Sequence, residues 1–329
     1  MMRWSILAAL LACGPVAPAA AQGAAPAPAR DGRWAIVVSG ASGGPAYAKQ
    51  LATWREAIQA ALTGRFGFTP AHVLQLVDET AREAGTPATA EQVRTLFTSL
   101  KGQVGKDDLV LLVLLGHGTF DGQQAKFNLV GPDLTAAEWR TLLDGLPGRM
   151  VVVNTTESSA PFMEALAAKG RIVITATETA AQKYATVFPE YFVKALGDAQ
   201  SDLDKNGRTS IWEVFSAASG AVARHYEERA QLTTERAMLS DTGDRTGVQA
   251  SATGPVGTMA RSFFLDRDVA SESADPEVRA LIERRRALEA EAEALIQQKE
   301  GADPAAWSAE FERLMIELAR VSREVRSRS

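Results

Sequence analysis

The segment LLGHGTFDG, residues 114–122, places a histidine between two glycines directly after an apolar run. An imidazole transfers protons near neutral pH more readily than other side chains, so His117 is a candidate general base. Gly116 and Gly118 permit a sharp backbone turn and leave one face of the imidazole open. The alternative is a histidine that only completes a structural turn.

A second group of reactive side chains follows the apolar run Val151–Val153. Residues 154–159, NTTESS, carry four hydroxyls, one amide and one carboxylate, and a helix is expected to begin near Pro161. In open parallel sheets, functional groups gather beyond the carboxyl ends of the strands. We therefore expect His117 and residues 154–159 to lie near each other.

These motifs resemble the caspase–legumain superfamily of cysteine peptidases. The shared features are a strand ending in Gly-His-Gly, a helix, and a second strand ending in a polar loop. The opening WAIVVSGASGGPAYAKQLATWREAIQ is also similar to the legumain-like branch, and the resemblance covers about residues 33–265. It implies that His117 acts as the base and that Gly118 lends a backbone N–H to an oxyanion hole.

The chain departs from this family at the nucleophile. The family pattern is roughly Ala-Cys-x-Ser-Gly, whereas residues 155–159 are TTESS, with Glu157 and Ser158 keeping the alignment. Thr156 therefore stands where the family has its cysteine. A hydroxyl is far less acidic than a thiol and needs a closely oriented base, and the threonine methyl group crowds the path of attack.

We expect Thr156 to be a vestigial nucleophile position in a pseudo-peptidase that binds peptides or proteins or acts as a scaffold. One alternative is an active peptidase or hydrolase that uses the hydroxyl of Thr156 or Ser158 with His117 as base. Another is a structural envelope protein that acts through its C-terminal helices.

A calcium site is predicted within DLDKNGRTSIWE, residues 202–213. The spacing matches the EF-hand loop, in which hard oxygen ligands surround the ion and a glycine at the sixth position permits the bend. The predicted ligands are Asp202, Asp204, Asn206, the backbone carbonyl of Arg208, Ser210 and Glu213. The alternative is a capped loop without metal, in which Asp202 and Asn206 form turn hydrogen bonds.

The first 21 residues resemble a secretory signal peptide. A single arginine precedes an apolar stretch, and small residues lead to Ala21. We expect a periplasmic or secreted protein with a linker at 22–32. In the alternative reading, Cys13 is lipidated and attaches the protein to a membrane. Cys13 is the only cysteine, so no intramolecular disulfide can form.

The net charge of −5 and the isoelectric point of about 5.5 argue against a nucleic-acid partner. Between 33 and 267, strand and helix patterns alternate, which predicts a three-layer α/β domain with a mainly parallel sheet. The segment 233–258 is expected to be a long surface loop. The expected strands are 34–40, 72–78, 107–118, 149–155, 171–177 and 260–265, and the expected helices are 46–63, 89–103, 133–146, 161–168, 187–197 and 210–231.

The region 276–329 is expected to form a helical hairpin. Apolar residues recur at heptad spacing on either side of EGADP, where Asp303 suits a helix cap and Pro304 suits the first turn. The hairpin either packs onto the α/β domain or forms an arm for a homo-oligomer or a partner helix.

Overall fold

The computed structural model describes residues 31–78, 85–233, 235–252, 257–266, 275–297 and 302–328. The expected signal peptide, Cys13 and most of the linker lie outside these ranges. No helix in the described ranges is both long and apolar enough to cross a membrane.

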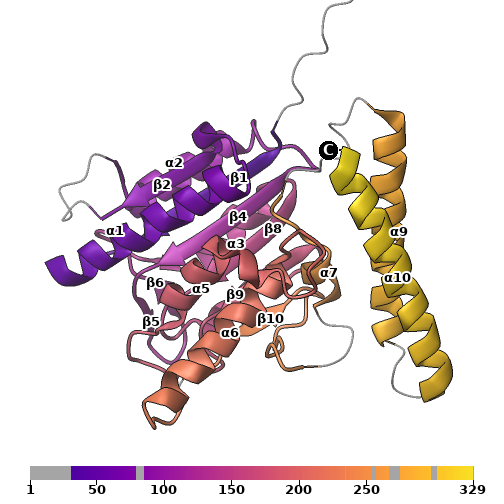
Figure 1. Cartoon of the computed structure of the whole chain (residues 1–329). Coiled ribbons are helices and arrows are strands. Elements are labelled where there is room, and N and C mark those ends of the chain that lie inside the picture. Colours follow the sequence, from indigo (N-terminus) through magenta and orange to yellow (C-terminus); the bar gives the residue numbers. More distant parts are fainter. Residues whose placement is uncertain are drawn as a thin grey trace, which may run out of the picture. The chain divides into compact units, whose positions relative to one another are not determined.

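A seven-stranded sheet forms the centre of the α/β region, and all its strands are parallel except β10, which runs antiparallel to β9 (Figure 1). The spatial order is β10-β9-β8-β4-β1-β2-β3. The bounds are β1 Arg33–Ser39, β2 Val73–Val77, β3 Thr86–Pro87, β4 Leu109–Leu115, β8 Arg149–Asn154, β9 Arg171–Thr175 and β10 Met238–Ser240. The central strands are almost wholly apolar, as expected for a sheet covered on both faces.

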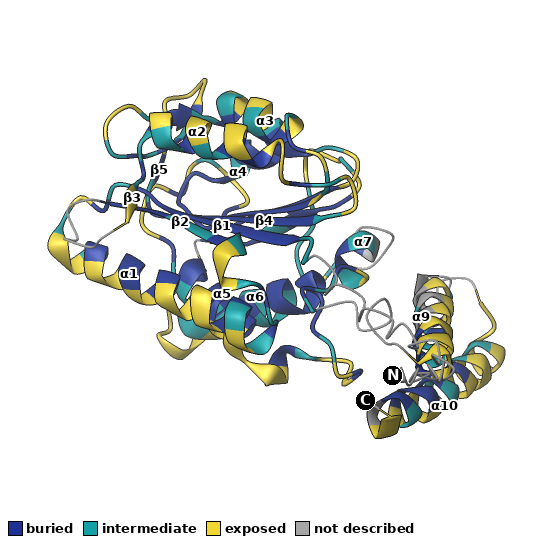
Figure 2. Ribbon diagram, turned by 90° about the horizontal axis from the view of Figure 1, so that it is seen from above, coloured by how far each residue is buried: buried dark blue, intermediate teal, exposed yellow. Residues whose placement is uncertain are grey.

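Helices cover both faces of this sheet (Figure 2). Successive strand residues point to opposite faces, so Val151 and Val153 join one core cluster while Met150 and Val152 join the other. One face carries α1 Pro45–Ala60, α5 Phe188–Gly197 and α6 Ile211–Glu228, and the other carries α2 Ala90–Leu100, α3 Ala136–Asp144 and α4 Ala160–Leu166. The predicted three-layer α/β architecture is therefore confirmed.

Shorter elements complete this region. A three-stranded antiparallel sheet begins at Gly118, directly after His117. It contains β5 Gly118–Phe120, β6 Ala125–Phe127 and β7 Leu134–Thr135. The single-turn helices are η1 Ala61–Arg65, η2 Pro70–His72, η4 Ala199–Ser201 and α7 Thr258–Arg261.

Two predicted elements were wrong. Residues 260–265 do not form a strand, because Asp241 accepts hydrogen bonds from the backbone N–H groups of Gly257 (2.9 Å) and Ala260 (3.0 Å) and so supports α7 there. Only Phe264 makes a strand-like bridge, to Ser210. The last strand is instead β10, which lies inside the segment expected to be a loop.

The C-terminal region consists of two helices, α9 Pro276–Gln297 and α10 Pro304–Arg328. Asp303 accepts a hydrogen bond from the backbone N–H of Ala306 at 2.8 Å and so caps α10 as expected. The buried residues that join the two helices are Val278, Ile282, Leu288, Ala292, Leu314, Leu318, Val321 and Val325.

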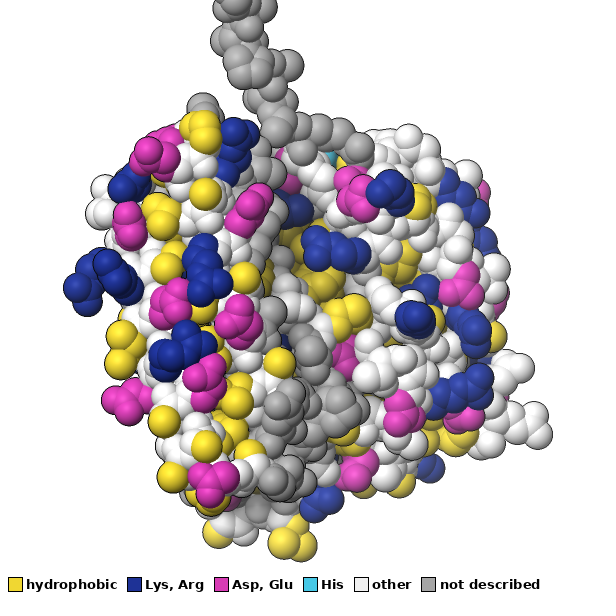
Figure 3. All heavy atoms as spheres, turned by 90° about the vertical axis from the view of Figure 1, so that its right-hand side faces the viewer, with side chains coloured by type: hydrophobic (Ala, Val, Ile, Leu, Met, Phe, Trp, Pro, Cys, Tyr) yellow, Lys and Arg dark blue, Asp and Glu magenta, His cyan; other side chains and the backbone are white. Residues whose placement is uncertain are grey.

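The ion pair between Arg284 of α9 and Glu317 of α10 (2.6 Å) also links the two helices. Over the molecular face displayed in Figure 3, basic and acidic side chains are interspersed.

Candidate active site

The pairing of β4 with β8 brings the two polar motifs together. Leu114 pairs with Asn154, so both strands end at the same edge of the sheet. The backbone N–H of Thr155 donates to the carbonyl oxygen of Leu114 at 3.1 Å. His117 follows one strand and Glu157 follows the other, and their side chains meet beyond the strand ends.

His117 forms an ion pair with Glu157. Its Nδ1 lies 2.8 Å from Glu157 Oε1, and the side chains are 32% and 9% exposed, respectively. The hydrogen bond to Glu157 raises the pKa of His117 above its ordinary value. Burial opposes this rise, while the charge of Glu157 and the backbone of Ser42 support it. The imidazole therefore holds its proton more tightly than a free histidine.

Tyr47, from α1, packs against the imidazole. The ring centroids of Tyr47 and His117 are 4.6 Å apart, and the tyrosine hydroxyl donates to the carbonyl oxygen of Gly116 at 3.3 Å. Burial and the negative charge of Glu157 raise the pKa of Tyr47, so its hydroxyl stays protonated. Tyr47 thus restricts the orientation of His117 from one side.

Gly118 lies against the polar segment after β8. A Cβ atom at this position would lie 2.5 Å from both Thr156 Oγ1 and the carbonyl oxygen of Glu157. Contacts this short are not tolerated, so the close approach of the two segments requires glycine. The structure therefore brings the three predicted site residues His117, Gly118 and Thr156 together.

The hydroxyl of Thr156 is buried and already engaged. The residue is 1% exposed, and its Oγ1 lies 2.8 Å from Asn154 Oδ1 and 3.0 Å from the carbonyl oxygen of Glu157. Both atoms are hydrogen-bond acceptors, and the backbone N–H of Thr156 donates to the same Asn154 oxygen at 3.1 Å. The Thr156 hydroxyl is thus bonded to groups of its own loop and not to the imidazole of His117.

The neighbouring hydroxyls are engaged in the same way. Thr155 donates to the carbonyl of Leu114 at 2.7 Å, and Ser158 donates to the carbonyl of Gln182 at 3.1 Å. Ser159 Oγ lies 3.1 Å from Thr177 Oγ1. These contacts fix residues 155–159 against the strand ends and against the segment that follows β9.

Two polar atoms of this loop stand out. Asn154 Nδ2 and Glu157 Oε2 are buried and have no hydrogen-bond partner within the described ranges. Ser158 has a φ of +52°, which is uncommon for a residue other than glycine. Buried polar atoms are rarely left unpaired, and strained backbone tends to gather at functional sites. Both observations mark residues 154–158 as more than a connecting turn.

Sequence reasoning missed two contributors to the site. The motif gives Glu157 no chemical role, yet its carboxylate is the partner of His117. Tyr47 lies 70 positions before His117 and has no motif of its own, so only the packing of α1 reveals it.

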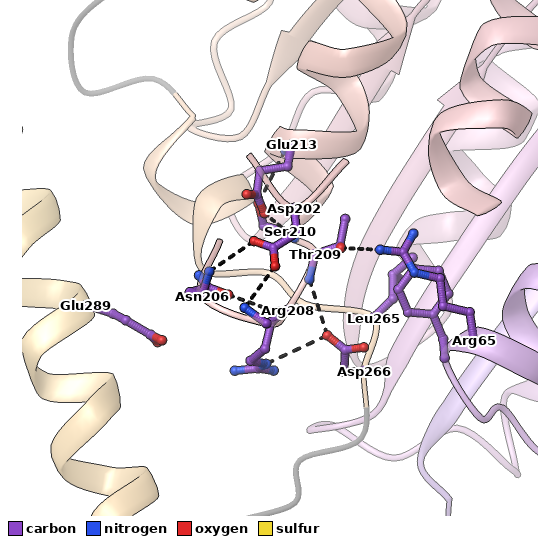
Figure 4. A network of polar contacts seen from close by, with 12 residues as sticks. Arg65, Asp202, Asn206, Arg208, Thr209, Ser210, Glu213, Leu265, Asp266 and Glu289 are labelled. Atoms are coloured by element: carbon purple, nitrogen blue, oxygen red, sulfur yellow. Dashed lines mark hydrogen bonds and ion pairs between the residues drawn. The ribbon is translucent and has the colours of Figure 1, made fainter. Parts of the chain in front are cut away.

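The predicted calcium loop brings three carboxylates together. One oxygen atom each from Asp202, Asp204 and Glu213 lie within 4.8 Å of one another. Figure 4 shows Asp202 and Glu213 of this loop close to each other. Desolvation within the loop and the neighbouring charges of Glu213 and Asp202 raise the pKa of Asp204 to about 7, although this residue remains exposed. A divalent cation bound between these oxygens would relieve the repulsion among them.

The turn glycine and two more of the predicted ligands shape the loop. Gly207 adopts a φ of +85°, and its backbone N–H donates to Asp202 Oδ2 at 2.9 Å. Asn206 accepts a hydrogen bond from the backbone N–H of Arg208 at 2.8 Å. The guanidinium of Arg208 lies over the ring of Phe264, at 3.7 Å from its centroid. Because a guanidinium has no acceptor atom, the backbone carbonyl is the group of Arg208 that could bind a cation.

Ser210 and Glu213 have a second role in this loop. They form a reciprocal capping box that starts α6. The backbone N–H of Glu213 donates to Ser210 Oγ at 3.2 Å, and the backbone N–H of Ser210 donates to Glu213 Oε2 at 2.8 Å. Glu213 Oε1 also accepts the backbone N–H of Leu203 at 2.8 Å. The geometry therefore suits both a calcium loop and the capped loop without metal.

Comparison with protein-family models finds no match, and comparison with curated proteins finds none either. Among solved structures, the chain is similar to protein GSU0716 from Geobacter sulfurreducens, with 14% identity and a TM-score of 0.41, over 63% of this chain and 92% of that one. It is also similar to a secreted C11 cysteine protease from Bacteroides thetaiotaomicron, solved with an irreversible peptide inhibitor. That match has 13% identity and a TM-score of 0.38, over 68% of this chain and 67% of the protease. Both TM-scores lie below 0.5.

Proposed function

We propose that this protein is an exported, catalytically inactive relative of the caspase–legumain peptidases that binds peptide or protein ligands at the site around His117. The observation that carries the proposal is that His117 is paired with Glu157, while the hydroxyl at the nucleophile position, Thr156, is buried and bonded within its own loop.

Hydroxyl nucleophiles need a neutral base within hydrogen-bond reach. Here the base candidate has a raised pKa and a carboxylate partner, so it favours the protonated form. The nucleophile position offers a hydroxyl whose contacts are Asn154 and the Glu157 backbone. These two features support loss of hydrolysis together with retention of the local architecture.

The direct test is incubation of the purified protein with a degenerate decapeptide library, with both cleavage and binding measured. We expect no turnover, and we expect binding that His117→Ala weakens. His225→Ala is the matched control, because His225 lies on α6 and is bonded to Tyr191. Robust hydrolysis that His117→Ala abolishes would overturn the proposal.

One observation favours the alternative of a hydroxyl hydrolase. Ser158 has positive φ in a strand–turn–helix segment, and nucleophilic serines of some hydrolases occupy such strained turns. Against this, Ser158 is 4% exposed and bonded to the Gln182 carbonyl. Labelling with a fluorophosphonate probe decides between the two. Modification of the wild type that is absent in Ser158→Ala would establish the hydrolase.

We further propose that calcium binds residues 202–213 and stabilises the α5–α6 connection. The crowding of the Asp202, Asp204 and Glu213 oxygens supports this role. Isothermal titration of metal-free protein is the test, and the absence of heat up to millimolar calcium would remove the site.

We base the proposal of export on residues 1–21 and the proposal of a partner or of self-association on α9 and α10. The signal-like first 21 residues support a periplasmic or secreted protein, with lipidation of Cys13 as the alternative route to a membrane. The α9–α10 pair is a candidate arm for self-association or for a partner helix. In the alternative function, the protein is a structural envelope protein that acts through this pair. Cell fractionation and light scattering of the full chain test these points.

A further inference from the structure

Asn154 is a buried amide at the carboxyl end of β8. The residue is 0% exposed, and its side-chain oxygen Oδ1 accepts two hydrogen bonds from Thr156. The backbone N–H of Thr156 donates to this oxygen at 3.1 Å, and the Thr156 hydroxyl donates to it at 2.8 Å. A single atom therefore holds both the backbone and the side chain of the residue at the nucleophile position.

These contacts also fix the orientation of the Asn154 amide. A flipped amide would set Nδ2 against the backbone N–H of Thr156, and two donors cannot bond to each other. In the orientation observed, Nδ2 has no hydrogen-bond partner among the residues that the structure describes. The oxygen is thus the atom of the side chain that acts on Thr156.

The backbone of Asn154 is anchored on both sides. In the sheet it pairs with Leu114 of β4 and with Thr175 of β9. Its carbonyl oxygen accepts the backbone N–H of Ala176 at 3.0 Å. Because both neighbouring strands hold the end of β8, the Asn154 side chain presents its oxygen from a fixed position.

A second acceptor competes for the Thr156 hydroxyl. The carbonyl oxygen of Glu157 lies 3.0 Å from Thr156 Oγ1, against 2.8 Å for Asn154 Oδ1. A hydroxyl carries one proton and donates to one of the two oxygens at a time. Asn154 is the nearer acceptor, and it belongs to a strand inside the sheet, whereas Glu157 belongs to the loop that follows.

We propose that Asn154 is a positioning residue, which keeps the hydroxyl of Thr156 in the χ1 rotamer directed at Asn154 Oδ1 and so withholds it from the imidazole of His117. A hydroxyl that donates to an amide oxygen does not donate to a base at the same time. The inference rests on the proposed function, the loss of hydrolysis, and deepens it by naming the residue that restrains the hydroxyl. Its test requires no ligand.

Two replacements of Asn154 separate the oxygen from the bulk of the side chain. Asn154→Leu keeps a similar size and removes the acceptor, whereas Asn154→Asp keeps an acceptor oxygen and removes Nδ2. NMR couplings between Cγ2 of Thr156 and its backbone nitrogen and carbonyl carbon report the χ1 rotamer in the full chain. We expect one rotamer in the wild type and in Asn154→Asp.

In Asn154→Leu, the ratio of this rotamer to the others should fall by roughly 2- to 10-fold, which corresponds to the loss of one hydrogen bond. Thr155 is the internal control, because its hydroxyl donates to the carbonyl of Leu114 at 2.7 Å and its rotamer should be the same in all three proteins. A role in packing alone predicts the opposite order, since leucine fills the space and aspartate introduces a charge. Loss of the single rotamer in Asn154→Asp, or its retention in Asn154→Leu, would overturn the proposal.

If the variants do not fold, the wild type alone decides. A single Thr156 rotamer with Oγ1 directed at Asn154 supports the proposal, and couplings averaged over several rotamers overturn it. Cleavage and binding of the decapeptide library are measured independently of this rotamer, so the proposed function and the role of Asn154 fail separately.

Discussion

His117 Nδ1 and Glu157 Oε1 lie 2.8 Å apart and join the ends of two adjacent parallel strands, β4 and β8. The imidazole therefore faces a carboxylate across the two strand ends. Because a carboxylate stabilises the imidazolium form, the contact favours the protonated histidine over the neutral base. The same contact also ties residues 155–159 to the loop after β4, so it has a structural consequence as well as a chemical one.

The first prediction concerns the proton affinity of His117. Replacement of Glu157 by Gln removes the largest cause of its raised pKa, so the pKa of His117 should fall. Proton NMR of the imidazole across pH 5–9 measures the change, with Glu178→Gln as the control because that exposed glutamate pairs with Arg236. An unchanged midpoint in Glu157→Gln would show that the ion pair does not set the pKa of His117.

The same pair predicts a pH dependence of stability. A raised folded-state pKa stabilises the protein below the unfolded histidine value of 6.5, and this contribution is lost as the pH rises through the folded-state pKa. Glu157→Gln should therefore destabilise the protein more at pH 6 than at pH 9. The difference should be on the order of 1 kcal/mol, because water partly screens His117. Urea unfolding at the two pH values measures it, and an equal loss at both would contradict the assignment.

The second prediction concerns the close approach at Gly118. Gly118→Ala places a methyl group 2.5 Å from Thr156 Oγ1 and from the Glu157 carbonyl, so the two loops must separate. We expect destabilisation of about 1–3 kcal/mol together with a shift of the His117 resonance. Gly102→Ala is the matched control, because a Cβ there meets open space. Equal unfolding free energies for the two variants would mean that the contact is loose.

Much of the fold could be predicted because its patterns are local. Apolar runs such as Leu109–Leu115 and capping residues such as Thr89, whose side chain accepts the Gln92 N–H, determine their elements from nearby residues. The error at 260–265 has the opposite cause. Phe263 and Leu265 are both buried, as alternate residues of a strand would be, but a distant aspartate, Asp241, turns the preceding residues into a helix.

The candidate site also has a part that could be predicted from the sequence and a part that could not. The proximity of His117, Gly118 and Thr156 could be predicted, because parallel strands end at a common edge. The partner of each side chain could not, because it depends on the path of the loop. With Ser158 at positive φ, the Glu157 carboxylate lies against His117 while the Thr156 hydroxyl lies against Asn154.

The third prediction asks whether a thiol at position 156 is sufficient for peptidase activity. In a Cys13→Ser background, Thr156→Cys provides a single cysteine at the family's nucleophile position. Since Thr156 is 1% exposed and bonded toward Asn154, we expect slow alkylation by iodoacetamide and no peptide hydrolysis. Peptidase activity that a further His117→Ala removes would show the contrary, namely that the site geometry is preserved and only the thiol is missing.

The fourth prediction separates the calcium loop from a capped loop without metal. Asp204→Asn removes one of three carboxylates whose oxygens lie within 4.8 Å of one another, so it relieves repulsion. At pH 8 without metal the variant should gain on the order of 1 kcal/mol of stability, a modest value because Asp204 is exposed to screening solvent. Calcium should raise the melting temperature of the wild type and raise that of the variant much less.

Two controls complete the calcium experiment. Asp198→Asn alters an exposed aspartate that caps η4 outside the predicted ligand set, and it should preserve the response to calcium. Magnesium at the same concentration should stabilise the wild type less, because the smaller ion demands a stricter octahedral geometry. If calcium stabilises the wild type and Asp204→Asn equally, the ion binds elsewhere. If it stabilises neither, residues 202–213 form the capped loop, in which Glu213 serves only to start α6.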